Sequence, residues 1–162
     1  MLTSLKIEMN LIDQLLEFYF KYDAFQEGYL PKERAREIYQ LLLDRGRLHI
    51  YQNAGELLGY GESWRINYEQ FGRIICGKNL YNHLEDEDIS TGNIAYLANV
   101  TIHPDWRNKT VLSILRNNFF TKNYSCDYFV GHAKRKKTQP VKVFTRQQAF
   151  AKWVNKDLQE AI

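Results

Sequence analysis

Hydrophobic residues in the first part of the chain recur at the spacing of α-helices. Between residues 8 and 22 the apolar side chains fall three or four positions apart, which predicts an amphipathic helix. Proline is well tolerated in the first turn of a helix, so Pro31 predicts the start of a second one. Its apolar positions Ile38, Leu41 and Leu42 repeat in the same way, and Gly46 marks its end.

Alternation of apolar and polar residues replaces this spacing after residue 46. Residues 47–52 predict a strand, residues 53–55 a tight turn, and residues 56–66 a long second strand. Residues 67–92 are the least regular part of the chain, with a short helix predicted at residues 68–75.

The second half alternates strands with helices. The pattern predicts a strand, an amphipathic helix, two strands and a terminal helix, at residues 93–102, 109–122, 126–132, 141–146 and 150–158. A strand–helix–strand unit predicts two parallel strands joined by a right-handed crossover. Together with the hairpin, it predicts an α/β fold, a mixed sheet flanked by helices, in one domain over residues 1–162.

Composition narrows the class of protein. With 44% hydrophobic and 25% charged residues the chain is typical of globular proteins, which excludes wholesale disorder. The two cysteines lie far apart and the four histidines lack ligand spacing, so neither a disulfide framework nor a metal site is predicted. The absence of a signal-peptide pattern and of a long apolar run predicts a cytoplasmic protein with no membrane span.

Charge is distributed unevenly, although the net charge is only +3. Residues 85–88 read Glu-Asp-Glu-Asp and residues 134–137 read Lys-Arg-Lys-Lys. Such runs are usually solvated faces. The basic run has three alternative ligands: an RNA or DNA, an acidic protein, or the 3′-phosphate of a nucleotide cofactor.

Residues 100–112 (VTIHPDWRNKTVL) resemble the coenzyme A motif of the GNAT superfamily of N-acetyltransferases. That motif is an apolar strand, a proline, an Arg or Gln, and a glycine-rich turn into a helix. Residues 56–61 (ELLGYG) resemble the hairpin of the same family, and the order of elements matches over roughly residues 8–146. A weaker likeness to the toxin-activating acyltransferases, which have a GNAT-like core, rests on element order and on the irregular residues 67–92.

The resemblance implies that acetyl-CoA, or another acyl-CoA, binds where the strand meets the helix. Backbone N–H groups at a helix start, and the helix dipole, favour a diphosphate there. The implied cofactor-binding residues are Val100, Ile102, Arg107, Asn108, Lys109, Thr110, Val111 and Leu112. The family usually has glycines where this chain has Asn108 and Thr110. The pantetheine arm would lie between strands 93–102 and 126–132, which splay apart in the family.

Acyl transfer to an amine needs a base, a donor to the developing oxyanion, and an acid for the leaving thiolate. Glu62 is the acidic member of an apolar face formed by Leu58, Tyr60, Trp64 and Ile66. Burial among them would raise the pKa of its carboxyl group, which suits a base near neutral pH. The alternative is a structural ion pair with an Arg or Lys.

Two further side chains complete the predicted catalytic set. Strand parity groups Asn99 with Ala95, Leu97, Thr101 and His103. In the family, backbone amides around Asn99 and Val100 would polarise the thioester carbonyl. The family takes the acid for the thiolate from a tyrosine on a helix that this chain lacks, which leaves Tyr128 as the candidate, on one face with Val130 and His132.

Two functions follow from the sequence. The first is an acyl-CoA-dependent N-acyltransferase, an acetyltransferase by its motif, that transfers directly to an amine-bearing acceptor in a ternary complex. The second is a non-catalytic GNAT-fold binding protein that engages nucleic acid or an acidic protein through residues 134–142. Both are compatible with a monomer or a homodimer.

Overall fold

Five strands form one mixed sheet in the computed structural model, in the spatial order β1-β2-β3-β4-β5. The strands are Leu48–Asn53, Glu56–Ile66, Ile94–Ile102, Tyr128–Gly131 and Lys142–Thr145. Only β3 and β4 pair in parallel, and every other neighbouring pair is antiparallel. The predicted mixed sheet and its one parallel pair are confirmed. The structure describes all residues except 1, 23–29, 79, 108, 132–140 and 156–162.

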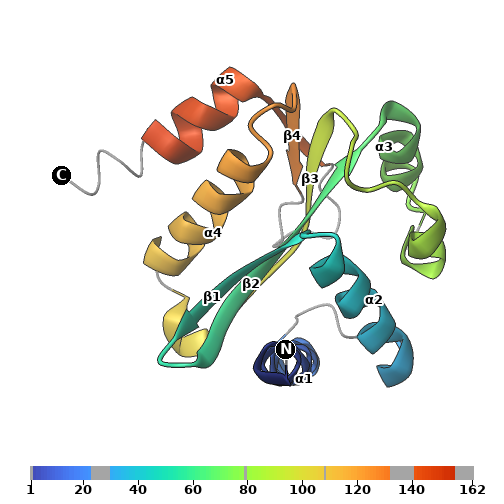
Figure 1. Ribbon diagram of the computed structural model, residues 1–162. Coiled ribbons are helices and arrows are strands. Elements are labelled where there is room, and N and C mark those ends of the chain that lie inside the picture. The colour runs from blue at the N-terminus through green and yellow to red at the C-terminus, as the bar shows by residue number, and fades with distance from the viewer. Residues whose placement is uncertain (1, 23–29, 79, 108, 132–140, 156–162) are drawn as a thin grey trace.

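Helices cover both faces of the sheet (Figure 1). The helices α1, α2 and α3 lie on one side, at Leu2–Tyr22, Lys32–Asp44 and Tyr68–Ile75. The helices α4 and α5 lie on the other, at Lys109–Lys122 and Arg146–Ala149. None of the helices in the described part of the chain is long and apolar enough to cross a membrane.

The C-terminal helix begins earlier than predicted. Thr145 and Gln148 form a capping box, in which the Thr145 side chain accepts from the Gln148 amide and the Gln148 side chain from the Thr145 amide. This reciprocal pair starts α5 four residues before the predicted helix. The chain then continues as the π-helical segment η3, Phe150–Asn155.

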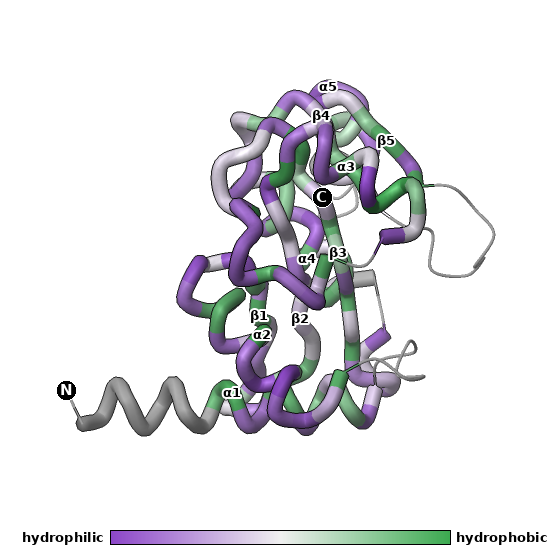
Figure 2. The backbone as a smooth tube through the Cα atoms, turned by 90° about the vertical axis from the view of Figure 1, so that its right-hand side faces the viewer, coloured by the Kyte–Doolittle hydropathy of each residue, from purple (hydrophilic) through white to green (hydrophobic). Residues whose placement is uncertain are grey.

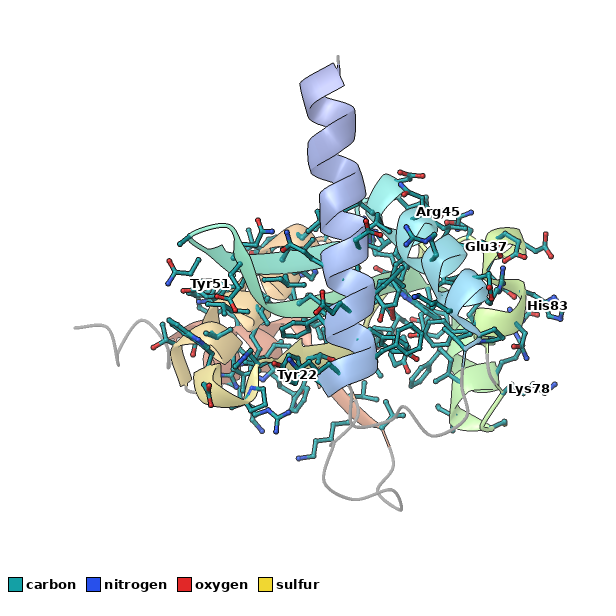
Figure 3. All side chains as sticks on the ribbon, turned by 90° about the horizontal axis from the view of Figure 1, so that it is seen from below. Tyr22, Glu37, Arg45, Tyr51, Lys78 and His83 are labelled. Atoms are coloured by element: carbon teal, nitrogen blue, oxygen red, sulfur yellow. The ribbon has the colours of Figure 1, made fainter. Side chains whose placement is uncertain are left out.

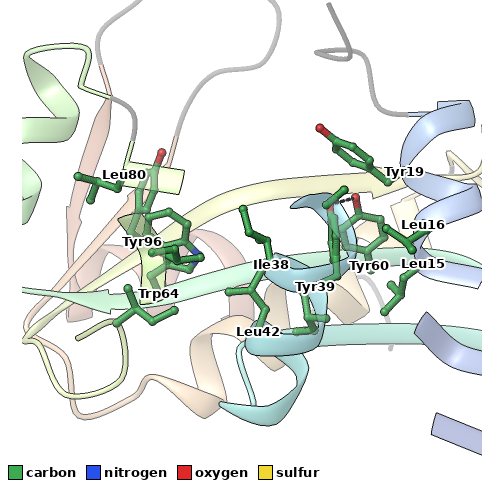
Figure 4. Close-up of a cluster of buried hydrophobic side chains, with 14 of the residues drawn as sticks. Leu15, Leu16, Tyr19, Ile38, Tyr39, Leu42, Tyr60, Trp64, Leu80 and Tyr96 are labelled. Atoms are coloured by element: carbon green, nitrogen blue, oxygen red, sulfur yellow. Dashed lines mark hydrogen bonds between the residues drawn. The ribbon is translucent and has the colours of Figure 1, made fainter. Parts of the chain in front are cut away.

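Each face of the sheet has its own buried cluster. The cluster under α1 and α2 packs Leu15, Ile38 and Leu42 against Tyr60 and Trp64 (Figure 4). The cluster under α4 and α5 is built from phenylalanines and small residues: Ala95, Phe119, Phe120, Cys126, Phe129 and Ala149. Figure 2 shows that α1 and the α5–β4 region lie at opposite ends of the molecule.

The irregular residues 67–92 are fixed against α2. They contain α3 and the 3-10 segment η1, Leu80–Asp86, and Figure 3 shows η1 with His83 beside α2 with Glu37 and Arg45. Arg34 of α2 donates to the Tyr81 carbonyl oxygen (2.9 Å) and to the Glu85 carboxylate (2.7 Å). Arg45 donates to the carbonyl oxygen of Glu87 (2.9 Å).

The acidic run at residues 85–88 is therefore only partly a solvated loop. The hydrogen bond and charge of Arg34 lower the pKa of Glu85. Arg73 lowers the pKa of Glu87 in the same way, through a contact of 2.7 Å. Two of the four acidic side chains are thus held in ion pairs that fasten this segment.

Candidate functional site

Glu62 lies in the middle of β2 and is 1% exposed. The hydroxyl group of Tyr81, from η1, donates a hydrogen bond to its carboxylate. Glu62 therefore has a tyrosine as a partner, where the sequence suggested either a base among apolar residues or an ion pair with an Arg or Lys. A hydroxyl donor supplies a buried carboxylate with one of the hydrogen bonds that it needs.

The predicted apolar face around Glu62 is confirmed for Tyr60, Trp64 and Ile66, which belong to the cluster under α1 and α2. Leu58 departs from it. The register between β1 and β2 shifts here, because Tyr51 pairs with Gly59 and Gln52 with Leu57. The extra residue is a bulge at Leu58, which brings Leu57 into the cluster in its place.

Tyrosine hydroxyls extend the polar network away from Glu62. The hydroxyls of Tyr39 and Tyr60 are 2.7 Å apart (Figure 4), and the side-chain amide of Asn99 donates to the Tyr60 hydroxyl at 3.4 Å. Burial, and next the neighbouring hydroxyl of Tyr60, raises the pKa of Tyr39 well above its usual value. Burial and then the charge of Glu62 do the same to the pKa of Tyr81. Both tyrosines therefore stay protonated, as donors, at neutral pH.

Asn99 lies on the opposite face from the one that strand parity predicts. Glu62 pairs with Asn99 and Ser63 with Leu97, so Ala98 is a bulge in β3. The bulge reverses the alternation. Ala95 and Leu97 belong to the cluster under α4, whereas Asn99 reaches Tyr60 on the side of α1 and α2. The structure thus brings Asn99 and Glu62 together, directly opposite each other.

β3 is longer than the described part of β4. Their parallel pairing runs from Ile94 opposite Tyr128 to Leu97 opposite Gly131. Residues 98–102 of β3 then have no strand on that side among the described residues, and this stretch is called the open edge below. The predicted splaying of the two strands concerns the stretch beyond Gly131, where residues 132–140 lie outside the described residues.

The open edge leads into the start of α4. The short segment η2, Pro104–Trp106, forms the turn, and His103 accepts the Asp105 amide at 3.1 Å. Nε of Arg107 donates to the carbonyl oxygen of Ile102 at 3.1 Å, which fixes this side chain over the end of β3. The first amides of a helix have no acceptor within the helix, so the turn beginning at Lys109 directs donors toward this junction.

The remaining residues of the predicted cofactor motif differ in their exposure to solvent. Thr110 is exposed in the first turn of α4, while Val111 is 1% exposed and packs beside Gly59 of β2. Val100, Ile102 and Leu112 are half-buried. Asn108 and the basic run at residues 134–137 lie outside the described residues, as does the side chain of Lys109.

Tyr128 is not close to the other two predicted catalytic residues. It pairs with Ile94 at the start of β4, whereas Asn99 lies five residues further along β3. At about 3.3 Å per residue this separates Tyr128 from Asn99 by roughly 15 Å. Its parity with Val130 is confirmed, since both contact the cluster under α1 and α2, and His132 lies outside the described residues.

Sequence reasoning missed Tyr81, the partner of Glu62. Residues 76–92 have no apolar period, so nothing in the pattern shows which of their side chains faces the sheet. Within the described part of the chain, no group of three or more His, Cys, Asp or Glu side chains could hold a metal ion.

Comparison with known proteins finds similarity in structure alone. No protein-family profile matches the sequence, and no curated protein matches it. The GphF GNAT-like decarboxylase, solved in complex with isobutyryl-CoA, superposes with a TM-score of 0.54 at 15% identity, over 74% of this chain and 60% of that chain. The chain therefore spans less than two thirds of the GphF structure.

The loading GNATL domain of CurA from Lyngbya majuscula superposes with a TM-score of 0.55 at 16% identity, over 83% of this chain and 67% of that domain. The element order, the mixed five-stranded sheet and these two superpositions agree with one another. At such low identity they establish architecture and leave activity open. The chain has the GNAT fold.

Proposed function

We propose that this protein is an acyl-CoA-dependent transferase that moves an acyl group, most simply acetyl, to an amine. The observation that carries the proposal is the junction at which β3, whose residues 98–102 pair with no described strand on the side of β4, leads through η2 into the first turn of α4. An extended chain with amide groups can lie along a free strand edge, and a diphosphate suits the start of a helix. The GphF structure contains isobutyryl-CoA, which supports the same class of ligand here.

The proposed reaction joins the amine nitrogen to the thioester carbonyl carbon and breaks the carbon–sulfur bond. Glu62 takes the proton that the amine loses, and because the carboxylate is buried, Tyr81 or a water molecule lies between the two. Backbone amides at Asn99 and Val100 stabilise the developing oxyanion. The departing sulfur leaves as the thiol of coenzyme A after it takes up a proton.

Binding of acetyl-CoA and isobutyryl-CoA tests the proposal by thermal unfolding. A ligand that binds only the folded state stabilises it by about 2.7 kcal/mol at a hundredfold excess over Kd. We expect Thr110→Asp to abolish the shift, because it adds negative charge beside the diphosphate, and Thr110→Gly to increase it. No shift at millimolar concentrations of either thioester would contradict the proposal.

Release of the coenzyme A thiol, with and without primary amines, identifies the reaction. Amine-dependent release supports acyl transfer. Release of carbon dioxide from malonyl-CoA without any amine would instead indicate a decarboxylase, as GphF is described. Nucleic-acid binding that weakens steeply with salt, in the absence of thioester binding, would favour a non-catalytic binding protein that uses residues 134–142.

A further inference from the structure

Three cationic side chains gather near the C-terminal end of α4 without a carboxylate partner. They are Arg47, which precedes β1, Arg65 of β2 and Lys122 of α4, called the cationic cluster below. None of the ion pairs formed by the described residues includes any of the three. Neighbouring cations repel one another, so such a cluster destabilises the protein unless other groups offset its charge.

Several observations place the three charges close together. A Cβ atom at Gly46, which directly precedes Arg47, would lie 3.5 Å from Nζ of Lys122. Burial, and next the charge of Arg65, lowers the pKa of Arg47. Loss of hydration, and next the charge of Arg47, lowers the pKa of Lys122. Each cation therefore makes positive charge harder to hold at its neighbour.

Arg47 is the most deeply buried of the three, and its hydrogen bonds are weak. The residue is 8% exposed. Its Nε donates to the carbonyl oxygen of Arg45 at 3.4 Å, and its Nη1 donates to Oδ1 of Asn123 at 3.5 Å. Both distances exceed the range of about 2.7–3.2 Å that is usual for N–H donors. A guanidinium has five N–H groups, and its burial is costly when it is not paired with an anion.

Helix ends offset only part of this charge. The carbonyl oxygens at the C-terminus of a helix carry partial negative charge, which favours a cation such as Lys122 in the last turn of α4. Arg65 donates to the carbonyl oxygen of Gly92 at 3.0 Å, which is another neutral acceptor. A group with full negative charge is what the cationic cluster lacks among the described residues.

We propose that the cationic cluster binds a phosphate group. A phosphate offers several acceptor oxygens to guanidinium and ammonium donors, together with the negative charge that the described residues do not supply. Lys122 is exposed and Arg65 is half-buried, so the cluster has a side that faces solvent. The site does not depend on the proposed acyl-CoA junction, which lies at the other end of α4, about 20 Å away at a rise of about 1.5 Å per residue.

Thermal unfolding in inorganic phosphate, with chloride at the same ionic strength as the reference, tests the proposal. We expect a saturable rise of the unfolding temperature with phosphate. Lys122→Gln should weaken the apparent affinity about three- to tenfold. Lys78→Gln is the matched control, an exposed lysine that follows α3 on the opposite side of the sheet, and should leave the affinity unchanged. Thr110→Asp, at the start of α4, should also leave it unchanged.

Arg47→Met adds a readout of opposite sign. It removes a buried charge that has no carboxylate partner, so it should maintain or raise the unfolding temperature in chloride while it abolishes the phosphate response. A lowered unfolding temperature in chloride with an unchanged phosphate response would overturn the inference. If Arg47→Met does not fold, Lys122→Gln decides, because a response equal to that of the unmodified protein would overturn the inference as well. No saturable response, or its loss in Thr110→Asp, would do the same.

Phosphoserine as a second probe distinguishes two sources of the phosphate group. Binding at least as tight as that of inorganic phosphate supports a site for a phosphate ester on a larger molecule. Binding of inorganic phosphate alone supports a site for the free anion.

Discussion

The two faces of the sheet bury opposite kinds of polar group. Toward α1 and α2 lie the carboxylate of Glu62 and the hydroxyls of Tyr39, Tyr60 and Tyr81. Toward α4 the buried groups are basic or neutral: Arg47, His49, Ser63 and Asn123. Nε2 of His49 lies 2.7 Å from Oγ of Ser63, which resembles the start of a catalytic dyad.

The difference teaches which face is suited to chemistry. His49 is 5% exposed and Ser63 is 0% exposed, and the ring of Phe119 packs 6.3 Å from the His49 ring. This histidine–serine pair is closed under α4 as part of the packing. Glu62 is just as buried, at 1% exposed, but it lies opposite Asn99 on β3, and the hydroxyl that donates to it comes from Tyr81 in a separate segment.

Removal of the packing on the α4 face should have the largest effect. Phe119 is 0% exposed and contacts the rings of His49, Phe129 and Trp153. We expect Phe119→Ala to lower the free energy of unfolding by about 3–5 kcal/mol, measured by urea titration. Ile75→Ala on α3, where the side chain is 57% exposed, is the control and should change it by less than about 1 kcal/mol. If both variants lost a similar amount of unfolding free energy, the cluster under α4 and α5 would not be a tight core.

Acid should weaken the α4 face through His49. Burial, then the charges of Lys122 and Arg47, lowers the pKa of His49 to about 4. Between the usual value of about 6.5 and that value the unfolded chain binds more protons, so stability falls as the pH falls through this window, by at most about 3 kcal/mol.

The His49→Gln variant isolates this contribution. Its free energy of unfolding should change less than that of the unmodified protein between pH 7 and pH 4.5, as followed by urea titration at each pH. His83→Gln on η1, where the side chain is exposed, should follow the unmodified protein. Parallel curves for all three proteins would exclude His49 as the source of acid sensitivity.

On the face toward α1 and α2, two tyrosine-to-phenylalanine variants sharpen the comparison. We expect them to have the smallest effects on the free energy of unfolding. Tyr81→Phe removes a donor to a buried carboxylate and should cost about 2 kcal/mol in unfolding free energy. Tyr39→Phe removes one of two neutral hydroxyls and should cost about 1 kcal/mol. A larger loss in Tyr39→Phe would mean that the network is organised around Tyr60 and not around Glu62.

Apolar spacing was enough to locate the regular elements. The bounds of β2, α3 and α4 are those predicted, because each combines a clear period with a recognisable start or stop. The bulges at Leu58 and Ala98 could not be predicted in this way. Residues 94–98 are all apolar, so a shift in alternation leaves no polar residue in the wrong place to reveal it.

The candidate site was predictable only in part for the same reason. Glu62 interrupts an apolar alternation and is visible in the sequence, whereas its partner Tyr81 depends on how an aperiodic segment folds back. The cationic cluster of Arg47, Arg65 and Lys122 is also invisible in the sequence, since these residues are far apart along the chain and only the fold brings them together.

Arg34 and Arg45 attach η1 and the residue that follows it mainly by main-chain oxygens, at Tyr81, Asn82, Leu84, Glu85 and Glu87. Every amino acid has that oxygen, so these anchors do not depend on which side chains the segment carries. Exchange of exposed residues such as Asn82, His83 and Asp86 should therefore alter the surface of this segment without moving the hydroxyl that touches Glu62.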